Sequence, residues 1–339
     1  MRFSASAFAP ACASPNHCET DPLRLFPDAS GGEAAVTRYR VFPGMELDYR
    51  DVHARACREL RDGSGERLEI HHCLEGRVEY RQNGRYFYLS PGDLAVARTS
   101  SLPPDSRFPT GHYHGITVTI DPAAAPECLS CILSDVEVRP ATLMEKLCPG
   151  GTVFTARSSR LVKHVFSELY AVPEDIRKGY LKVKLLELLL FLSTLSPEDG
   201  QTPHGCTAAQ VSLAEQVKAR LLAEPDRTLT LKSLSQQFNV SEAQIKSSFT
   251  GVYGMSPAAY ARSQRMHGAA ALLRETDRTV LDIACQFGYD NASKFARAFR
   301  DVIGVSPREY RAGAEYDSCA PQLGEKPVSL SDADVERRI

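Results

Sequence analysis

The chain has 339 residues, a formal net charge of −2 at pH 7, 43% hydrophobic residues and 24% charged residues. This length is enough for two domains, and the composition is that of an ordinary soluble protein. The N-terminus has no continuous apolar segment of the kind found in signal peptides. The most apolar run, residues 185–192, contains Glu187 and is too short to cross a bilayer. We therefore expect a cytoplasmic protein that does not bind a membrane.

Ten cysteines are scattered along the chain, and a cytoplasmic setting keeps most of them reduced. Cys128 and Cys131 form a CxxC motif, which is a weak signal for a redox pair or for half of a zinc site. No second CxxC stands at the spacing of a zinc ribbon, so we interpret the pair as structural and reduced. Cys285 is expected to be a small buried apolar residue.

Between residue 31 and about residue 121 the hydrophobic period is two, which predicts short β-strands. The candidate strands cover residues 68–73, 77–81, 85–89 and 94–97. Asn83-Gly84 predicts a tight hairpin turn, because both residues accept a left-handed conformation. The pattern is typical of a small β-barrel or sandwich. The run from Gly76 to Leu94, with GRVEY and YLSPGDL, resembles a cupin-like sensor domain.

A further strand is predicted at residues 112–120. His112 and His114 share one parity with three aliphatic residues, and the other parity carries Tyr, Gly and two Thr. Alternation would place the aliphatic set inward, so we expect both histidines to point into the barrel. Polar groups that converge in an apolar cavity are typical of a small-molecule site. His71 and His72 face opposite ways, so only one can join them, and His72 is the candidate.

Three histidines also allow a metal site. Metal-binding cupins usually add a downstream Glu and a further His on another strand, and that set cannot be completed here. Three alternatives stay open: ligand contacts, core histidines bonded to backbone, and metal ligands. We predict neither a metal nor a cofactor, and hence no cupin enzyme.

After residue 155 the period becomes helical. One helix is predicted at residues 158–170 and a second at residues 175–195, which is dense in leucine. So wide an apolar surface needs more than one neighbour. Packing on the barrel is one explanation, and self-association into a homodimer is the other. Residues 196–205 form a polar, turn-rich linker.

A unit of helix, turn and helix then occurs twice, about fifty residues apart. In the first copy Asn239 suits a left-handed turn, Ser241 caps the second helix, and Ile245 and Phe249 form a buried pair. The corresponding residues of the second copy are Gly288 at the turn, Asp290 or Asn291 as the cap, and Phe295 and Phe299 as the buried pair. This layout is that of a helix-turn-helix, whose second helix enters the DNA major groove.

A continuous helix is predicted between the copies, from Pro257 to about Arg274. At 1.5 Å per residue it is roughly 27 Å long. Successive major grooves on one face of DNA lie about 34 Å apart. Such a spacer could hold two reading helices in adjacent grooves, with some bending of the duplex.

The second copy resembles the signature of the AraC/XylS transcriptional regulators. The matching residues are Ile283-Ala284, Gly288-Tyr289, Phe295, Phe299, Gly304, Pro307 and Tyr310-Arg311. The resemblance covers residues 212–311. The first copy carries Ser247 and Thr250 where the family usually has basic residues. The resemblance also implies a cupin-like sensor domain ahead of the DNA-binding module and helical dimerisation between them.

The resemblance assigns base contact to exposed positions of both reading helices. In the first helix these are Ala243, Gln244, Lys246 and Ser247, and in the second Ser293, Lys294 and Arg297. Arg297 is the strongest candidate because a guanidinium can bond a guanine edge with two hydrogen bonds, whereas Lys294 and Arg300 are candidates for phosphate contact. Residues 211–311 hold 14 Lys and Arg against 10 Asp and Glu, a balance of +4, so the basic charge lies in this module.

The sequence thus predicts an α+β protein of two domains, with a cupin-like β-barrel and following helices ahead of an all-α double helix-turn-helix. The expected segments are a partly disordered extension (1–30), a sensor domain (31–156), a helical pair for dimerisation (157–196), a linker (197–210), the DNA-binding domain (211–312) and a flexible tail (313–339). The predicted function is ligand-responsive, sequence-specific regulation of transcription, with double-stranded DNA, RNA polymerase and a small-molecule effector as partners. A constitutive DNA-binding dimer and a metal-dependent cupin enzyme are the alternatives.

Overall fold

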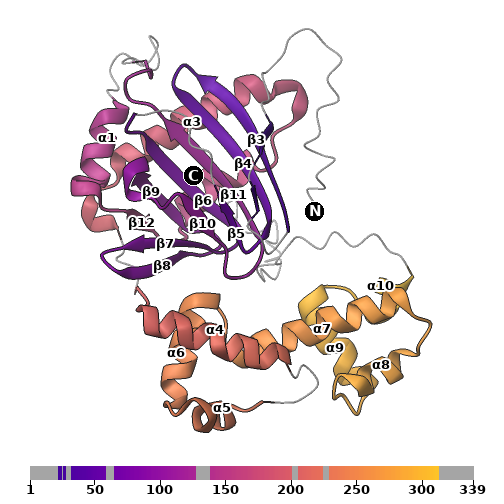
Figure 1. Ribbon diagram of the computed structural model, residues 1–339. Helices are drawn as coiled ribbons and strands as arrows, with labels where there is room; N and C mark the ends of the chain where they lie inside the picture. The colour runs from indigo at the N-terminus through magenta and orange to yellow at the C-terminus, as the bar shows by residue number, and fades with distance from the viewer. Residues whose placement is uncertain are drawn as a thin grey trace, which may run out of the picture. The chain divides into compact units, whose positions relative to one another are not determined.

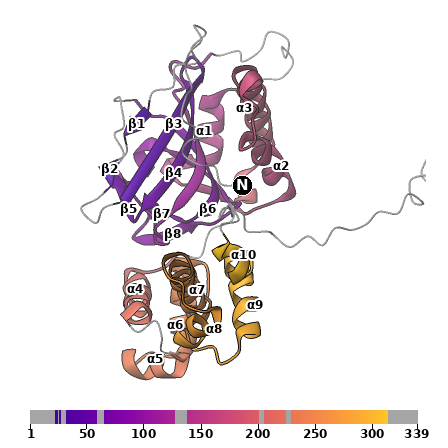
Figure 2. The same ribbon diagram turned by 90° about the vertical axis from the view of Figure 1, so that its right-hand side faces the viewer.

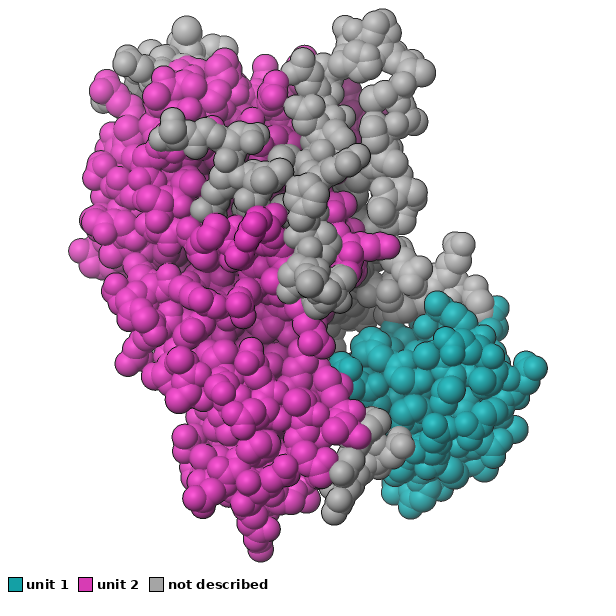
Figure 3. All heavy atoms as spheres, viewed as in Figure 1, with its two compact units in different colours: residues 1–10, 263–339 teal, residues 11–262 magenta. Residues whose placement is uncertain are grey.

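The computed structural model describes residues 22–24, 26–27, 32–58, 65–126, 138–200, 205–223 and 229–312. The chain divides into two compact units, named here by chain order: the first unit is residues 11–262, magenta in Figure 3, and the second unit is residues 1–10 and 263–339, teal in Figure 3. The CxxC motif of Cys128 and Cys131 lies outside the described residues. The expected domain boundaries stay predictions.

The first unit begins with two antiparallel β-sheets (Figure 1). The larger sheet contains, in spatial order, β1 (Pro22–Arg24), β3 (Gly32–Phe42), β4 (Met45–Ala54), β11 (Tyr113–Ile120), β6 (Leu68–Gly76), β9 (Leu94–Arg98) and β12 (Phe154–Ala156). The smaller sheet contains β2 (Phe26–Pro27), β5 (Ala56–Arg58), β10 (Asp105–Arg107), β7 (Val78–Gln82) and β8 (Arg85–Leu89). Asn83 and Gly84 adopt positive φ values of 50° and 72° between β7 and β8, which confirms the predicted hairpin turn.

The described strands form two packed sheets and not one closed barrel. Val52 and Tyr113 of the larger sheet share an apolar core with Val78, Tyr80 and Leu89 of the smaller sheet. In the larger sheet β1 and β12 each pair on one side only, so the described sheet keeps two open edges. The expectation of a barrel is therefore corrected to the sandwich that the strand pattern also allowed.

The second face of the larger sheet is covered by helices. These are α1 (Pro140–Leu147), α2 (Arg160–Leu169) and α3 (Arg177–Thr194), with α2 and α3 side by side in Figure 2. The Tyr49 hydroxyl of β4 donates to the carbonyl oxygen of Leu169 at 2.6 Å, which ties the sheet to α2. Helices α2 and α3 were both predicted from the helical spacing of their apolar residues. The larger sheet is thus the middle layer of three, with the smaller sheet on one face and helices on the other.

Helix α3 buries most of its leucine surface inside this unit. Its buried apolar side chains are Leu181, Leu185, Leu188, Leu189, Phe191 and Leu192. Packing on the sheet therefore accounts for much of the apolar surface that suggested a dimer. Short 3-10 turns occur at Thr99–Ser101, Pro149–Gly151, Glu174–Ile176 and Pro197–Asp199.

Helices alone make up the described residues from Ala208 onward. They are α4 (Ala208–Ala223), α5 (Leu231–Phe238), α6 (Glu242–Tyr253), α7 (Pro257–Glu275), α8 (Val280–Gln286), α9 (Ala292–Ile303) and α10 (Pro307–Arg311). The boundary between the two units falls within α7. Two separate apolar cores result, one around Ile245 and Phe249 and the other around Phe295 and Phe299. No helix among the described residues is long and apolar enough to cross a bilayer.

Candidate functional site

The first helix-turn-helix is α5, a turn and α6. Asn239 ends α5 in the left-handed conformation, with φ 52° and ψ 45°. The side chain of Ser241 then accepts a hydrogen bond from the Gln244 backbone N–H at 3.1 Å and begins α6. Ile245 and Phe249 are fully buried. Each of these roles was predicted from the sequence, because turn, cap and buried pair depend on local chemistry.

The second helix-turn-helix is α8, a turn and α9. Gly288 takes the turn with φ 79°. Asn291 is the cap: its Oδ1 accepts from the backbone N–H groups of Ser293 at 2.7 Å and Lys294 at 3.2 Å. Phe295 and Phe299 are fully buried. Of the two predicted caps, the structure selects Asn291 and leaves Asp290 exposed.

The sequence-predicted DNA-contacting residues all lie on the exposed faces of α6 and α9. They are Gln244, Lys246 and Ser247 on α6 and Ser293, Lys294, Arg297 and Arg300 on α9. On α9, Ser293, Arg297 and Arg300 follow one another at four and three residues, so they share a stripe opposite the buried phenylalanines. Lys294 lies 3.9 Å from Asp290 in an exposed ion pair, which contributes little to stability. The side chains on this stripe are available to a ligand.

The two helices differ in charge. Helix α9 carries Lys294, Arg297 and Arg300 against Asp301, whereas α6 carries Lys246 against Glu242. Phosphate contact therefore has more support on α9. Cys285 of α8 is exposed, so the expectation of a buried residue was wrong. The buried residues of α8 are Ile283 and Ala284, so the buried face of this helix does not include Cys285.

Polar contacts join the β-sandwich to α4, to α6 and to the residues just before α4, all within the first unit. Arg77, next to β7, donates from Nη2 to the carbonyl oxygen of Gly251 in α6 at 3.1 Å. Tyr86 of β8 and Cys206 exchange backbone hydrogen bonds of 2.9 and 2.8 Å. Lys218 of α4 donates to the carbonyl oxygen of Pro109 at 3.0 Å. The sequence carried no signal for these contacts, because they join segments far apart along the chain.

The predicted ligand histidines do not point between the sheets. Tyr113 faces the smaller sheet, so His114, of opposite parity, faces the helix-covered side of β11. His112 lies beside it, with ring centroids 6.4 Å apart. The expected orientation was wrong because the aliphatic parity packs against helices and not against the second sheet. Alternation tells which residues share a face, but not which layer covers that face.

His72 and His71 face opposite ways, as predicted. The His72 ring stacks on Phe166 of α2 at 4.1 Å, and its Nδ1 lies 2.9 Å from the Tyr170 hydroxyl. Burial lowers the pKa of His72 to about 4, so its ring is neutral at pH 7. His71 lies on the other face, with Nδ1 3.1 Å from the Thr117 hydroxyl. None of the contacts described for His72 involves His112 or His114.

Two of the described cavities bear on small-molecule binding. One between the sheets has about 20 Å³, the space of a single water, so this part of the interior is filled. The other has about 330 Å³ and opens beside the β7–β8 hairpin. Its walls include the aromatic rings of Tyr80, Phe87 and Tyr88 and the polar groups of Asp93 and Arg157. An apolar lining with a few polar groups is typical of a small-molecule site.

Comparison with protein families and curated proteins bears on the C-terminal helices. A family described as a helix-turn-helix domain matches residues 234–313. The uncharacterized HTH-type transcriptional regulator YdiP of Escherichia coli is 24% identical over 275 residues, which cover 77% of this chain and 88% of that protein. The arabinose operon regulatory protein of Salmonella typhimurium is 24% identical over 259 residues, which cover 71% of this chain and 82% of that protein. The transcriptional regulator Rob of Salmonella typhimurium is 32% identical over 93 residues, so the match spans only 32% of its length and 27% of this chain.

Two of the matching solved structures are the following. The AraC-like transcriptional activator CuxR matches with 13% identity and a TM-score of 0.34, over 74% of this chain and 86% of that chain. The DNA-binding domain of AdpA, solved with a target DNA, matches with 25% identity and a TM-score of 0.28, over 29% of this chain and 89% of that chain.

Proposed function

We propose that helix α9 supplies most of the sequence-specific DNA recognition of this chain, whose C-terminal helices match the helix-turn-helix domain of AraC-type transcriptional regulators, with α6 as the weaker reader. The observation that carries this proposal is the exposed stripe of Ser293, Arg297 and Arg300 opposite two fully buried phenylalanines. Burial of the phenylalanines fixes the rotation of α9, so the stripe has one orientation.

Each residue of α9 has a role in this proposal. Arg297 has no ion pair with another described residue, and its guanidinium can donate two hydrogen bonds to a guanine edge. Lys294 and Arg300 neutralise phosphates on either side of that contact. On α6, Gln244 can pair with an adenine edge, Lys246 with a phosphate, and Ser247 with either. RNA polymerase is the partner through which a DNA-bound regulator would act.

The β-sandwich is proposed to sense a small molecule. The cavity of about 330 Å³ beside the β7–β8 hairpin is the binding place that the geometry favours, while the predicted His72 is occupied by its contacts with α2. Arg77 precedes β7 and bonds to Gly251 of the first reading helix. A ligand that binds one arrangement of this hairpin better than another would shift the position of α6.

A homodimer is part of the same proposal. Three large apolar side chains remain exposed on or beside α2 and α3: Leu161, Ile176 and Val183, the last with 63% of its surface exposed. Analytical ultracentrifugation of the full chain, with Val183→Glu as the variant, tests this surface. A wild type that sediments as a monomer at micromolar concentration would remove the dimer from the account.

Selection of duplexes from a random library by the full-length protein tests DNA recognition. We expect one enriched sequence, bound at least 1,000-fold more tightly than a scrambled duplex, on the order of the usual specificity of such proteins. The double variant Lys294→Ala, Arg297→Ala should lose this preference. Arg160→Ala, which removes an exposed charge from α2, is the matched control and should bind as the wild type does. Absence of any enriched sequence would contradict the proposal.

A tryptophan in the cavity tests effector binding. The chain has no tryptophan, so Phe87→Trp adds a single fluorophore to the cavity wall and reduces its volume. A metabolite that raises the melting temperature of the wild type should change the emission of this tryptophan and bind the variant more weakly. A stabilising metabolite that does neither binds elsewhere. If no metabolite of a broad panel stabilises the protein, the constitutive alternative is favoured.

A further inference from the structure

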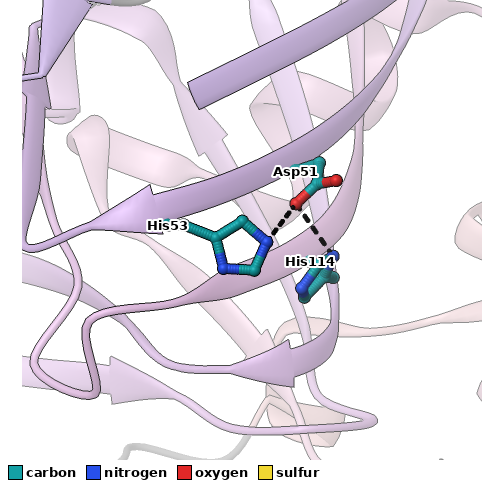
Figure 4. Close-up of side chains that lie close together, drawn as sticks. All are labelled: Asp51, His53 and His114. Carbon is teal, nitrogen blue, oxygen red and sulfur yellow. Dashed lines mark ion pairs between the residues drawn. The ribbon is translucent and has the colours of Figure 1, made fainter. Parts of the chain in front are cut away.

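Three side chains from two neighbouring strands meet on the helix-covered side of the larger sheet (Figure 4). Asp51 and His53 stand two residues apart on β4 and therefore share a face. His114 of β11 is the cross-strand partner of Asp51. The backbone register therefore brings the three together, and no unusual rotamer or loop conformation is needed.

Two imidazole rings converge on one carboxylate oxygen. Asp51 Oδ1 lies 3.0 Å from His53 Nε2 and 3.3 Å from His114 Nδ1. The candidate ligand atoms of all three residues lie within 4.8 Å of one another. A metal with bonds of about 2.1 Å to nitrogen and oxygen holds its ligand atoms about 3.4 Å apart in a tetrahedron. Small side-chain rotations would bring the three atoms to that spacing.

The carboxylate oxygen at the centre is incompletely satisfied. Asp51 Oδ1 is a buried atom that makes no hydrogen bond of good geometry with the described residues, although both rings are within ion-pair distance. A buried carboxylate oxygen without a strong partner is unfavourable. A cation seated between this oxygen and the two ring nitrogens would satisfy all three atoms at once.

The cluster is also accessible from one side. The side chain of His114 is 15% exposed and that of Asp51 is 26% exposed, whereas that of His53 is 56% exposed. Asp51 and His114 therefore form the inner side of the cluster, and His53 lies at its border with the solvent. His112 stands next to this group, with its ring 6.4 Å from that of His114, where a fourth nitrogen could approach.

We propose that Asp51, His53 and His114 bind a divalent first-row transition-metal ion. Two imidazoles and one carboxylate suit zinc, iron(II), nickel and copper, and they do not suit calcium or magnesium, which prefer oxygen ligands. Three protein ligands leave at least one position open to water or to a small molecule. The ion would cross-link β4 to β11 in the centre of the larger sheet. This site is independent of the cavity beside the β7–β8 hairpin and of DNA reading.

Metal binding to tag-free, full-length protein tests the site. The protein is first stripped with a chelator and then titrated with Co²⁺, whose visible absorption reports nitrogen and oxygen coordination, and with Zn²⁺ by calorimetry. We expect one ion per chain. His53→Ala should weaken binding about 100-fold or more, because loss of even an outer partner of a metal ligand weakens binding about 10- to 100-fold. Asp51→Asn should do the same.

His164→Ala is the matched control. His164 is 65% exposed and lies 3.7 Å from Glu187 in α3, so it represents an ordinary surface histidine beside a carboxylate. It should leave stoichiometry and affinity unchanged. Because His53 is mostly exposed, His53→Ala is expected to fold, and its circular dichroism spectrum and melting temperature in chelator should match those of the wild type.

Two results would overturn the proposal. One is a wild type that binds no Co²⁺ or Zn²⁺ at one ion per chain. The other is an affinity that His53→Ala and Asp51→Asn leave unchanged, or that His164→Ala lowers by as much as they do. Binding to scattered surface histidines would produce the second pattern.

Discussion

The two helix-turn-helix units share a skeleton and differ in their exposed faces. Each has a left-handed residue at the turn, a polar cap, and a fully buried apolar pair four residues apart. The exposed face of α9 carries Lys294, Arg297 and Arg300, whereas that of α6 carries Lys246 as its only cation near the predicted contact positions. In addition, α6 is bonded to the β-sandwich through Arg77.

The comparison shows that the residues that determine the fold differ from those proposed to contact DNA. The features that form each helix-turn-helix are buried or lie in the backbone, and they are present in both copies. The features that could recognise DNA lie on the surface, where substitution costs little stability. One copy can therefore lack basic residues and keep its fold, and α6 is instead hydrogen-bonded to the β-sandwich.

The largest effect is expected for the buried aromatic rings. Phe295→Ala should destabilise the second unit by about 3–5 kcal/mol, because it removes a fully buried ring and leaves a cavity. Phe249→Ala should have an effect of similar size in the first unit. Hydrogen exchange of the full chain, followed by mass spectrometry, measures both locally. A large effect in only one unit would show that the skeletons are not equivalent.

The next effect concerns the reading stripe. Arg297→Ala should weaken binding to the selected duplex by about 1–3 kcal/mol, the contribution of a bidentate guanine contact. Ser247→Ala, at an exposed position of α6, should change it by less. Fluorescence anisotropy at fixed salt gives both values. If Ser247→Ala is the more damaging change, α6 is the principal reader.

Removal of the helix caps should give a smaller effect. Asn291→Ala removes the acceptor for two backbone N–H groups and should destabilise α9 by about 1 kcal/mol, within the usual range of roughly 0.5–2. Ser241→Ala removes the acceptor for one N–H group and should cost less. The first-turn amides of each helix report this by hydrogen exchange. Equal effects would mean that the second hydrogen bond of Asn291 adds nothing.

The smallest effect is expected for Asn239→Gly at the turn of the first helix-turn-helix, and the equivalent turn of the second serves as its comparison. Asn239 has φ 52°, a conformation in which glycine is unstrained. Asn239→Gly should therefore change the stability of the first unit by less than about 1 kcal/mol. Gly288→Ala, at the equivalent left-handed turn, should destabilise the second unit by about 1–2 kcal/mol. Thermal unfolding followed by circular dichroism measures both, and a stable Gly288→Ala would contradict the reason given for glycine there.

Local chemistry made part of the molecule predictable. The turn residues Asn239 and Gly288, the caps Ser241 and Asn291 and the Asn83-Gly84 hairpin were all found from the sequence, because each depends on a few neighbouring residues. The period also gave α2, α3 and the buried pairs of α6 and α9. The residues proposed to contact DNA are predicted from the sequence alone, and their exposure is consistent with that role.

Other features depend on contacts between distant segments. Strand alternation placed His112 and His114 on the same face of β11 as its aliphatic residues, but it did not predict that helices cover that face. Six strands, β5 to β10, separate Asp51 and His53 of β4 from His114 of β11 along the chain, so only the register of β4 and β11 reveals the cluster. The hydrogen bond from Arg77 to Gly251 likewise joins residues far apart along the chain, so the sequence did not predict it.

Helix α9 is proposed to supply most of the base recognition. The most direct test is to repeat the duplex selection with Arg297→Ala and compare its enriched sequence with that of the wild type. The account predicts that the preference disappears at one or two adjacent base pairs and that the rest of the sequence is retained. An unchanged sequence in the variant would show that Arg297 reads no base, and would contradict the account.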